Sequence, residues 1–257
     1  MHFNYMKYIT LTLLIFVLLF ALKKYSGQSY ISTLHEFTNS ELPIYCVQTN
    51  NKQLALTFDS AWGTEDLDQI LQILEQYQVT ATFFVTGQWA KEHPDAIIKI
   101  DQAGHELGNH GMNHKHMPQL SKDEIKKEIT DCDTTVSALT GKNMNVFRAP
   151  YSDWNDLVVD TAKECGYWSI NQSVDSLDWK DYGIDAIIQR VCNHKNLENG
   201  AILLLHNGSK YTKDALSPML SALKEDGYSF VPVSQLIYKE NYYIDHTGKQ
   251  FNQSEKK

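Results

Sequence analysis

The sequence predicts an α/β fold, a distorted (β/α) barrel of about seven parallel strands that alternate with helices. Short apolar runs alternate with segments of helical periodicity across residues 50–237. Polar or charged side chains follow one apolar run after another, as they do at the carboxyl ends of barrel strands, where the active sites of such folds are built. An open doubly wound sheet is the alternative, but it concentrates its site at one switch point.

Each predicted element rests on a local signal. The apolar run 54–58 is followed by a helical pattern from Glu65, and then by a run at 79–85 that is rich in Val, Thr and Phe, which favour strands. Several later helices begin at a proline or a capping pair, or end before a glycine. They are expected at 94–104, 121–141, 155–165, 185–194 and 214–226. Strands are expected between them at 106–109, 145–147, 167–174 and 202–205.

The amino terminus carries a candidate membrane segment. Residues 8–22 are an unbroken run of apolar residues and Thr, with lysines on both sides. The run is shorter than the ~20 residues that usually span a bilayer, and no small-residue cleavage site follows it. We expect residues 1–27 to be an uncleaved single-pass anchor that leaves the rest of the chain outside the cytoplasm, at the cell membrane. A cleaved signal segment, which would make the protein secreted, and a buried core helix are the alternatives.

The rest of the chain divides into three parts. We expect a linker and a first strand at 28–49, the barrel at 50–237 and a polar tail beyond the core at 238–257. The net charge is −8 and the lysines and arginines form no stripe, which excludes a nucleic-acid partner. The four cysteines are widely separated and are expected to be small core residues. We expect a monomer.

Two histidines four residues apart, His110 and His114, follow the predicted strand at 106–109. This spacing brings two imidazoles to one side of a helical turn and suits adjacent ligands of a zinc-like ion. Surface histidines also occur at this spacing by chance, but the position after a strand favours a functional pair.

Two further strand ends carry candidate catalytic groups. Asp59 follows the apolar run 54–58 and is a candidate general base, metal ligand or helix cap. Arg148 precedes a turn stiffened by Pro150, where its guanidinium is suited to hold a carboxylate. The alternative for Arg148 is an exposed surface residue.

The last strands end in acids, an aromatic residue and a third histidine. Asp175, Asp178 and Trp179 share one loop, and flat aromatic rings beside acids are common in sugar sites because they cover the apolar faces of pyranoses. A solvated loop is the alternative. His206 follows the apolar run 201–205 and would share a rim with the other candidates, although a lone His after a strand is more often structural.

Together these segments resemble the polysaccharide deacetylase family, the carbohydrate esterases with a NodB-type domain. Five motifs occur in the family's order over about residues 50–237: Thr57-Phe58-Asp59, His110-x-x-x-His114, Arg148-x-Pro150-Tyr151, Asp175-x-x-Asp178-Trp179 and Leu204-x-His206. The resemblance implies a distorted barrel and removal of acetyl groups from N-acetylated sugars. It also implies a divalent metal, with zinc as the first choice and cobalt or manganese as alternatives.

The resemblance implies a role for each motif residue. Asp59 would be the base that activates water, and His206 would be the acid that protonates the leaving amine. His110 and His114 would be metal ligands. The remaining implied roles are Arg148 orienting Asp59, Asp175 tuning His206, the Tyr151 N–H stabilising the oxyanion, Trp179 and Leu204 lining the acetyl pocket, and Asp178 binding substrate.

One position departs from the family pattern. The family's first motif usually carries two consecutive aspartates, the second a metal ligand, and here Ser60 takes that place. Two neutral imidazoles and a hydroxyl bind a divalent ion more weakly than two imidazoles and a carboxylate. Asp59 itself, Glu65 or Asp66 are alternatives for the missing ligand.

The first motif also points to a branch of the family. Its form, Phe58-Asp59-x-x-Trp62-Gly63, resembles the sporulation-associated branch, which carries an amino-terminal membrane segment, and implies peptidoglycan as the target. The leading hypothesis is therefore a membrane-anchored deacetylase of N-acetylated cell-wall glycan. The alternatives are a catalytically weak or inactive glycan-binding protein with a structural role in cell-wall or spore formation, and a different metal-dependent amidase on the same barrel.

Overall fold

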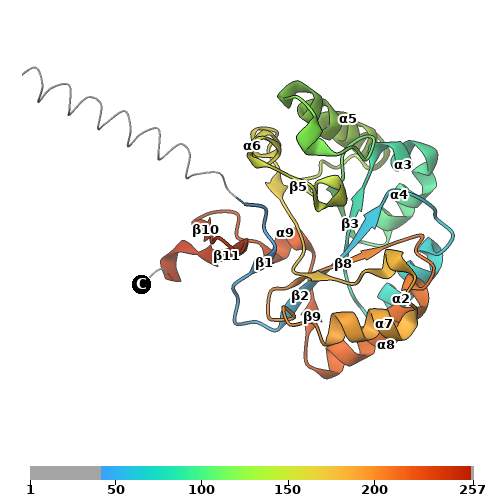
Figure 1. Cartoon of the computed structure of the whole chain (residues 1–257). Helices are drawn as coiled ribbons and strands as arrows, with labels where there is room; N and C mark the ends of the chain where they lie inside the picture. The colour runs from blue at the N-terminus through green and yellow to red at the C-terminus, as the bar shows by residue number, and fades with distance from the viewer. Residues whose placement is uncertain (1–41, 256–257) are drawn as a thin grey trace, which may run out of the picture. The chain divides into compact units, whose positions relative to one another are not determined.

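The computed structural model describes residues 42–255, which form an α/β domain around a curled parallel sheet (Figure 1). Seven strands pair in one row: β6 (Trp168–Ser169), β5 (Val146–Phe147), β4 (Glu106–Asn109), β3 (Thr82–Val85), β2 (Gln53–Ser60), β8 (Ile202–His206) and β7 (Val174–Asp175). An eighth, β9 (Ser229–Phe230), pairs with the start of β2. The predicted barrel of parallel strands is confirmed, but it is an open half-barrel because the row ends at β6 and β7 without closing.

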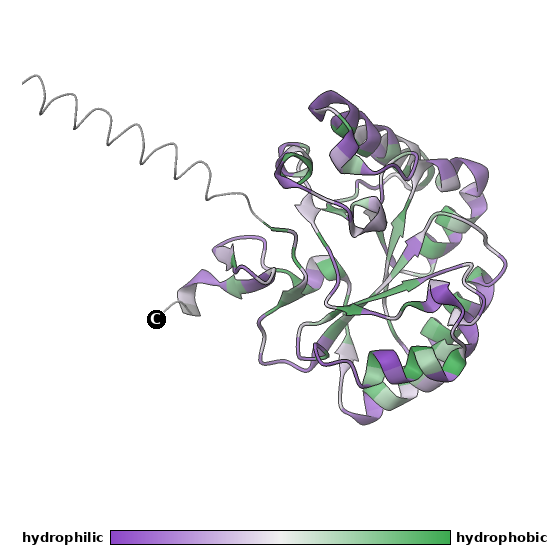
Figure 2. Cartoon of the chain, in the orientation of Figure 1, coloured by the Kyte–Doolittle hydropathy of each residue, from purple (hydrophilic) through white to green (hydrophobic). Residues whose placement is uncertain are grey.

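Helices lie outside the curled sheet and bury one stripe against it (Figures 1 and 2). Their bounds are α2 (Leu67–Gln76), α3 (Gly87–Glu92), α4 (Pro94–Gln102), α5 (Lys122–Thr140), α6 (Asp156–Glu164), α7 (Ile184–Cys192), α8 (Thr212–Glu225) and α9 (Val233–Leu236). Short 3₁₀ turns lie at η1 (Met117–Gln119), η2 (Pro150–Ser152), η3 (Asp178–Lys180) and η4 (Gln253–Glu255). The helix predicted at 94–104 is α4, which opens at Pro94, and a short helix that was not predicted, α3, precedes it with Thr86 as its cap.

The two-residue period of a strand decides which side chains reach the inside of the half-barrel. On β2, Leu54, Leu56 and Phe58 pack into the main core with the helices, while Thr57 and Asp59 alternate with them. The same alternation on β8 sends its odd-numbered leucines into that core. His206 is therefore on the same side as Asp59, and the two residues pair in register across β2 and β8.

The expectation that residues 238–257 form a polar tail beyond the core is wrong. The hairpin β10 (Tyr242–Ile244) and β11 (Lys249–Asn252) joins β1 (Cys46–Val47) in a three-stranded sheet. The Gln250 side chain is fully buried, accepts from the Tyr238 N–H at 2.8 Å and donates to the Tyr238 carbonyl at 2.7 Å. The prediction followed the polar composition of this segment. In the structure the polar groups of the hairpin are satisfied, because it pairs with the distant strand β1.

The sequence predicts a membrane anchor and a linker at the amino terminus. Within residues 42–255 no helix is long and apolar enough to cross a membrane. The predicted anchor at 1–27 lies outside the described residues, as does the linker up to residue 41.

The four cysteines are free; Cys46 and Cys132 are buried, as expected of core residues, and Cys165 and Cys192 are half-buried.

Gly200→Ala is expected to destabilise the domain by more than about 2 kcal/mol, because a Cβ would lie 1.9 Å from the Val47 carbonyl oxygen at a φ of +83°. Gly166→Ala is the matched control, with a φ of +87° and nothing within 4 Å of the added Cβ, and is expected to cost about 1 kcal/mol. Chemical unfolding followed by circular dichroism measures both. Equal losses would contradict the close contact between Gly200 and β1.

Candidate active site

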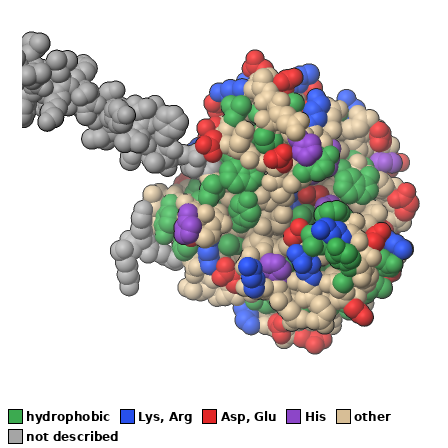
Figure 3. Space-filling model, viewed as in Figure 1, with side chains coloured by type: hydrophobic (Ala, Val, Ile, Leu, Met, Phe, Trp, Pro, Cys, Tyr) green, Lys and Arg blue, Asp and Glu red, His purple; other side chains and the backbone are tan. Residues whose placement is uncertain are grey.

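A cleft of about 630 Å³ lies at the carboxyl ends of the strands. Figure 3 shows this face of the domain, where acidic, histidine, basic and hydrophobic side chains gather around a hollow. The structure brings most of the predicted site residues together in its walls: Asp59, His110, His114, Tyr151, Asp175, Trp179, Leu204 and His206. Ser60, Arg148 and Asp178 are buried behind the walls, and Trp62 and Lys210 are additional lining residues.

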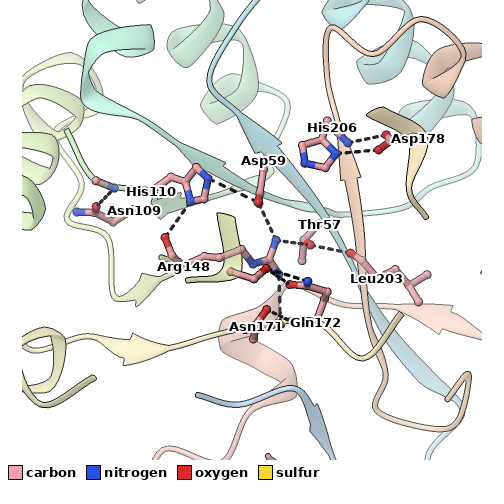
Figure 4. Close-up of polar contacts among 12 residues, drawn as sticks. Thr57, Asp59, Asn109, His110, Arg148, Asn171, Gln172, Asp178, Leu203 and His206 are labelled. Atoms are coloured by element: carbon pink, nitrogen blue, oxygen red, sulfur yellow. Dashed lines mark hydrogen bonds and ion pairs between the residues drawn. The ribbon is translucent and has the colours of Figure 1, made fainter. Parts of the chain in front are cut away.

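Asp59 is held by a buried ion pair. Arg148 Nη1 donates to Asp59 Oδ1 at 2.7 Å, and the same nitrogen lies 2.9 Å from Thr57 Oγ1 (Figure 4). Burial by itself raises the pKa of Asp59, but the positive charge of Arg148 and the nearby histidines outweigh it and leave the pKa below its usual value. Asp59 is therefore a carboxylate, and the predicted orienting role of Arg148 is supported by direct contact.

His110 lies on the other side of Asp59. Its Nδ1 is 2.8 Å from the Arg148 carbonyl oxygen, which can only accept, so Nδ1 carries the proton. Its Nε2 lies 3.6 Å from Asp59 Oδ2 (Figure 4). Burial lowers the pKa of His110, which keeps the ring neutral with the Nε2 lone pair in the cleft.

His114 reaches the cleft on an irregular loop, and the helical turn that its spacing predicted is absent from residues 110–114. Gly111 and His114 both have positive φ, 76° and 52°, which a helix does not allow. The rings of His110 and His114 still meet edge to face, with centroids 5.0 Å apart. Burial lowers the pKa of His114 to about 4, so this imidazole is also neutral at physiological pH.

Helix α5 holds that loop in place through a carboxylate that the sequence reasoning missed. Glu128 is buried and accepts from the Asn113 backbone N–H at 2.7 Å and from Asn113 Nδ2 at 2.8 Å. It also forms an ion pair with Lys115 at 2.9 Å. No local signal marks Glu128, because only the packing of α5 against the loop brings it there.

His206 pairs with Asp178 and not with Asp175, the acid predicted to tune it. His206 Nδ1 donates to Asp178 Oδ1 at 2.7 Å, and the His206 backbone N–H donates to Asp178 Oδ2 at 2.7 Å (Figure 4). Asp178 is fully buried and outside the cleft wall, so the prediction that it binds substrate is wrong. Asp175, expected to tune His206, lines the cleft and accepts from the Leu177 N–H at 2.9 Å. Sequence spacing could not decide which acid a left-handed turn at Leu177 directs inward.

His206 is the group most ready to carry a proton. Burial lowers the pKa of His206, but the hydrogen bond and charge of Asp178 outweigh it and raise the pKa above 6.5. Thr212 Oγ1 also donates to Asp178 Oδ2, at 2.5 Å, and this bond keeps the carboxylate fixed. The site therefore holds an ionised carboxylate, Asp59, and an imidazole, His206, whose protonated form Asp178 stabilises, on adjacent strands.

Aromatic side chains surround the opening of the cleft. Tyr151, with a φ of 62°, meets His114 edge-on at 4.5 Å and stacks on His116 at 4.1 Å between ring centroids. Trp179 is half-exposed on the opposite loop, and Leu204 is buried in the wall. These positions agree with the predicted substrate-binding residues.

Trp62 is a site residue that the sequence reasoning did not select. Its ring stacks on His206 with an interplanar angle of 15° and 5.9 Å between centroids, and it meets His114 edge-on at 5.8 Å. Trp62 comes three residues after Asp59, just past the end of β2. The position after a strand end, which identified the other residues, was the available signal.

The donors at the site do not fit the three-ligand pattern of a catalytic zinc centre. His110 and His114 supply two neutral imidazoles, but no group of three His, Cys, Asp or Glu side chains within residues 42–255 is placed to hold a metal. Ser60 is fully buried and its Oγ has no hydrogen-bond partner there. Of the alternatives for the missing ligand, Asp59 is held by Arg148, and Asp66 accepts the Gly208 N–H instead of facing the cleft.

Comparisons with known proteins agree on one family. A sequence model described as polysaccharide deacetylase matches residues 47–170. A peptidoglycan-N-acetylglucosamine deacetylase of Bacillus cereus is 37% identical over 198 residues, covering 74% of this chain and 91% of that protein. A peptidoglycan-N-acetylmuramic acid deacetylase of Bacillus subtilis is 31% identical over 204 residues, covering 76% and 75%. A Bacillus anthracis structure described as a CE4 family pseudoenzyme has a TM-score of 0.73 at 36% identity, covering 76% of this chain and 68% of that one.

Asp178→Asn is expected to lower the pKa of His206, whereas Asp175→Asn, the matched control, changes it much less. In the wild type, Asp178 raises the folded pKa above the unfolded one, so the resulting stabilisation is full below about pH 6.5 and is lost as the pH rises through the folded pKa. The loss of stability in Asp178→Asn is therefore larger near pH 5.5 than near pH 9. NMR titration of the His206 ring and unfolding at both pH values measure these effects. A larger shift in Asp175→Asn would contradict the assignment.

Proposed function

Because the chain belongs to the polysaccharide deacetylase family, we propose that it removes acetyl groups from N-acetylated amino sugars of a cell-wall glycan, with peptidoglycan as the preferred target. The observation that carries the proposal is the position of the Asp59 carboxylate beside His206, whose pKa Asp178 raises, on neighbouring strands of one cleft. The peptidoglycan substrates that the relatives' names state support the choice of target. Aromatic rings around the opening support a sugar ligand.

The proposed reaction divides the proton transfers between the two groups. Water adds to the carbonyl carbon of the acetamido group, and the Asp59 carboxylate takes the proton that the water loses. The C–N bond then breaks, and His206 donates its proton to the leaving nitrogen. The products are acetate and a free amino sugar. The Tyr151 N–H is proposed to stabilise the negative oxygen of the tetrahedral intermediate.

The electrostatics of Asp59 limit the rate of this reaction. Arg148 keeps Asp59 ionised, but a carboxylate of lowered pKa is a weak base toward ordinary water. A bound divalent metal would supply acidified water, yet the donors present are two imidazoles and a serine hydroxyl. We therefore propose that any metal binds weakly and that turnover is slow.

A glycan-binding protein with little or no hydrolysis is the second candidate. It is favoured by the unpartnered Ser60 Oγ and by the absence of a three-ligand group within the described residues. The similar Bacillus anthracis structure is described as a pseudoenzyme, which supports the absence of hydrolysis in this candidate. Glycan binding needs the cleft and its aromatic walls, which are present.

The cellular setting is part of the proposal. We propose that residues 1–27 anchor the chain in the cell membrane with the domain outside the cytoplasm, where cell-wall glycan is accessible. The form of the first motif, with Trp62 and Gly63 after Asp59, supports placement in the sporulation-associated branch. A monomeric state remains part of this proposal.

Asp59→Asn and His206→Ala are each expected to reduce acetate release from peptidoglycan at least about 100-fold, because each removes one of the two proton-transfer groups. Leu157→Ala, an exposed position on α6 outside the cleft, is the control and should retain the wild-type rate. Circular dichroism confirms folding of all three variants. Wild-type rates in both cleft variants would rule out the proposed mechanism.

Ser60→Asp is expected to bind zinc, cobalt or manganese at least about tenfold more tightly than the wild type, because it adds a carboxylate to two neutral imidazoles. Tm after chelation and metal addition measures this without reference to activity, since a ligand that binds only the folded state raises Tm. Ser60→Asn is the control of equal size without the charge. Acetate release is measured in the same samples and should rise in Ser60→Asp. Equal Tm shifts in the two variants would show that position 60 is not a ligand position.

A further inference from the structure

Exposed aromatic side chains line the cleft and continue beyond it on the loop that carries Trp179. Within residues 42–255, six large hydrophobic side chains are exposed, and three of them, Trp62, Tyr151 and Trp179, line the cleft. Tyr182 follows Trp179 three residues along the same loop and is the most exposed of the six, at 67%. Soluble domains seldom cluster exposed aromatic rings in this way unless the rings bind a ligand.

The loop that carries these rings is held in a strained conformation. Leu177 and Asp181, at either end of η3, have positive φ values of 51° and 55°. Non-glycine residues adopt this region at a cost and are held there by surrounding contacts. Here the contacts are made by Asp178, which is bound to His206 and Thr212 inside the domain. The loop conformation that displays Trp179 and Tyr182 is therefore tied to the catalytic histidine.

The chemistry of this surface fits a sugar better than a protein or lipid. Lys180 and Asp181 separate the rings, and Lys180 Nζ lies over the Trp179 ring at 5.0 Å. Asp181 and Lys210 line the adjoining cleft wall and offer an acceptor and a donor beside the rings. A pyranose has apolar faces and a hydroxyl edge, whereas a lipid or a protein hot spot needs a contiguous apolar patch.

We propose that Tyr182 forms a second sugar-binding platform next to Trp179, so that the cleft holds two linked residues of a glycan chain and the next residue of the same chain lies on Tyr182. This inference rests on the proposed function and names its ligand as a glycan chain longer than a disaccharide. Asp181 lines the cleft and directly precedes Tyr182, so the platform continues the cleft wall. Binding therefore strengthens with chain length, because each added stacked residue covers more aromatic surface.

The test compares the dimer and the pentamer of N-acetylglucosamine by isothermal titration calorimetry with the full chain in detergent. The wild type is expected to bind the pentamer about tenfold more tightly than the dimer. Tyr182→Ala should remove this preference while leaving dimer affinity unchanged. Tyr182→Phe keeps the ring and should keep the preference. Leu157→Ala, exposed on α6 away from the cleft, is the surface control and should also keep it.

The outcomes separate the two proposals. A pentamer preference that survives in Tyr182→Ala, or a wild type that binds both lengths equally, overturns the second platform and leaves the proposed function intact. Loss of the preference in Tyr182→Phe also overturns it, because the ring would then not be the binding element. Failure of the folded wild type to bind either oligosaccharide overturns the proposed function together with the platform.

Discussion

The buried ion pair between Arg148 and Asp59 is the interaction on which the rest of the site depends. Arg148 follows β5, whereas Asp59 lies on β2, and two other strands lie between these in the sheet. The guanidinium therefore crosses the inside of the half-barrel, where it also lies over the Phe84 ring at 4.2 Å. Loss of one partner would leave an unpaired buried charge at a cost of about 3–5 kcal/mol. The pair thus fixes the ionisation of the Asp59 carboxylate.

Buried neighbours also decide the charge of the histidines in the cleft. Burial lowers the pKa of His110 and of His114, whereas Asp178 raises the pKa of His206 although that ring is also buried. Three rings of one residue type therefore differ in protonation only because their buried neighbours differ. The base and the acid are separated by one strand spacing, which suits transfer of protons to and from a single small group such as an acetamide.

Ser60 stands where the family's first motif usually carries a second aspartate, and the groups around it keep their contacts. Its Oγ is buried and unpartnered, while the neighbouring Asp59 keeps its ion pair and the two imidazoles keep their positions. Proton transfer and glycan binding can therefore persist where metal binding is poor.

The sequence by itself determined the fold class, the strand ends and most of the site, because a strand followed by a polar residue is a local pattern that Asp59, His110 and His206 all show. The single strand predicted at 167–174 is wrong, because β6 and β7 are separate strands at opposite ends of the row, and the sequence could not decide whether they pair to close the barrel. It could not distinguish Asp175 from Asp178, because a left-handed turn at Leu177 directs one inward. Nor could it place Glu128 or the β10–β11 hairpin, whose partners are distant in the chain. Only the tertiary structure decided these points, because long-range packing and burial set them.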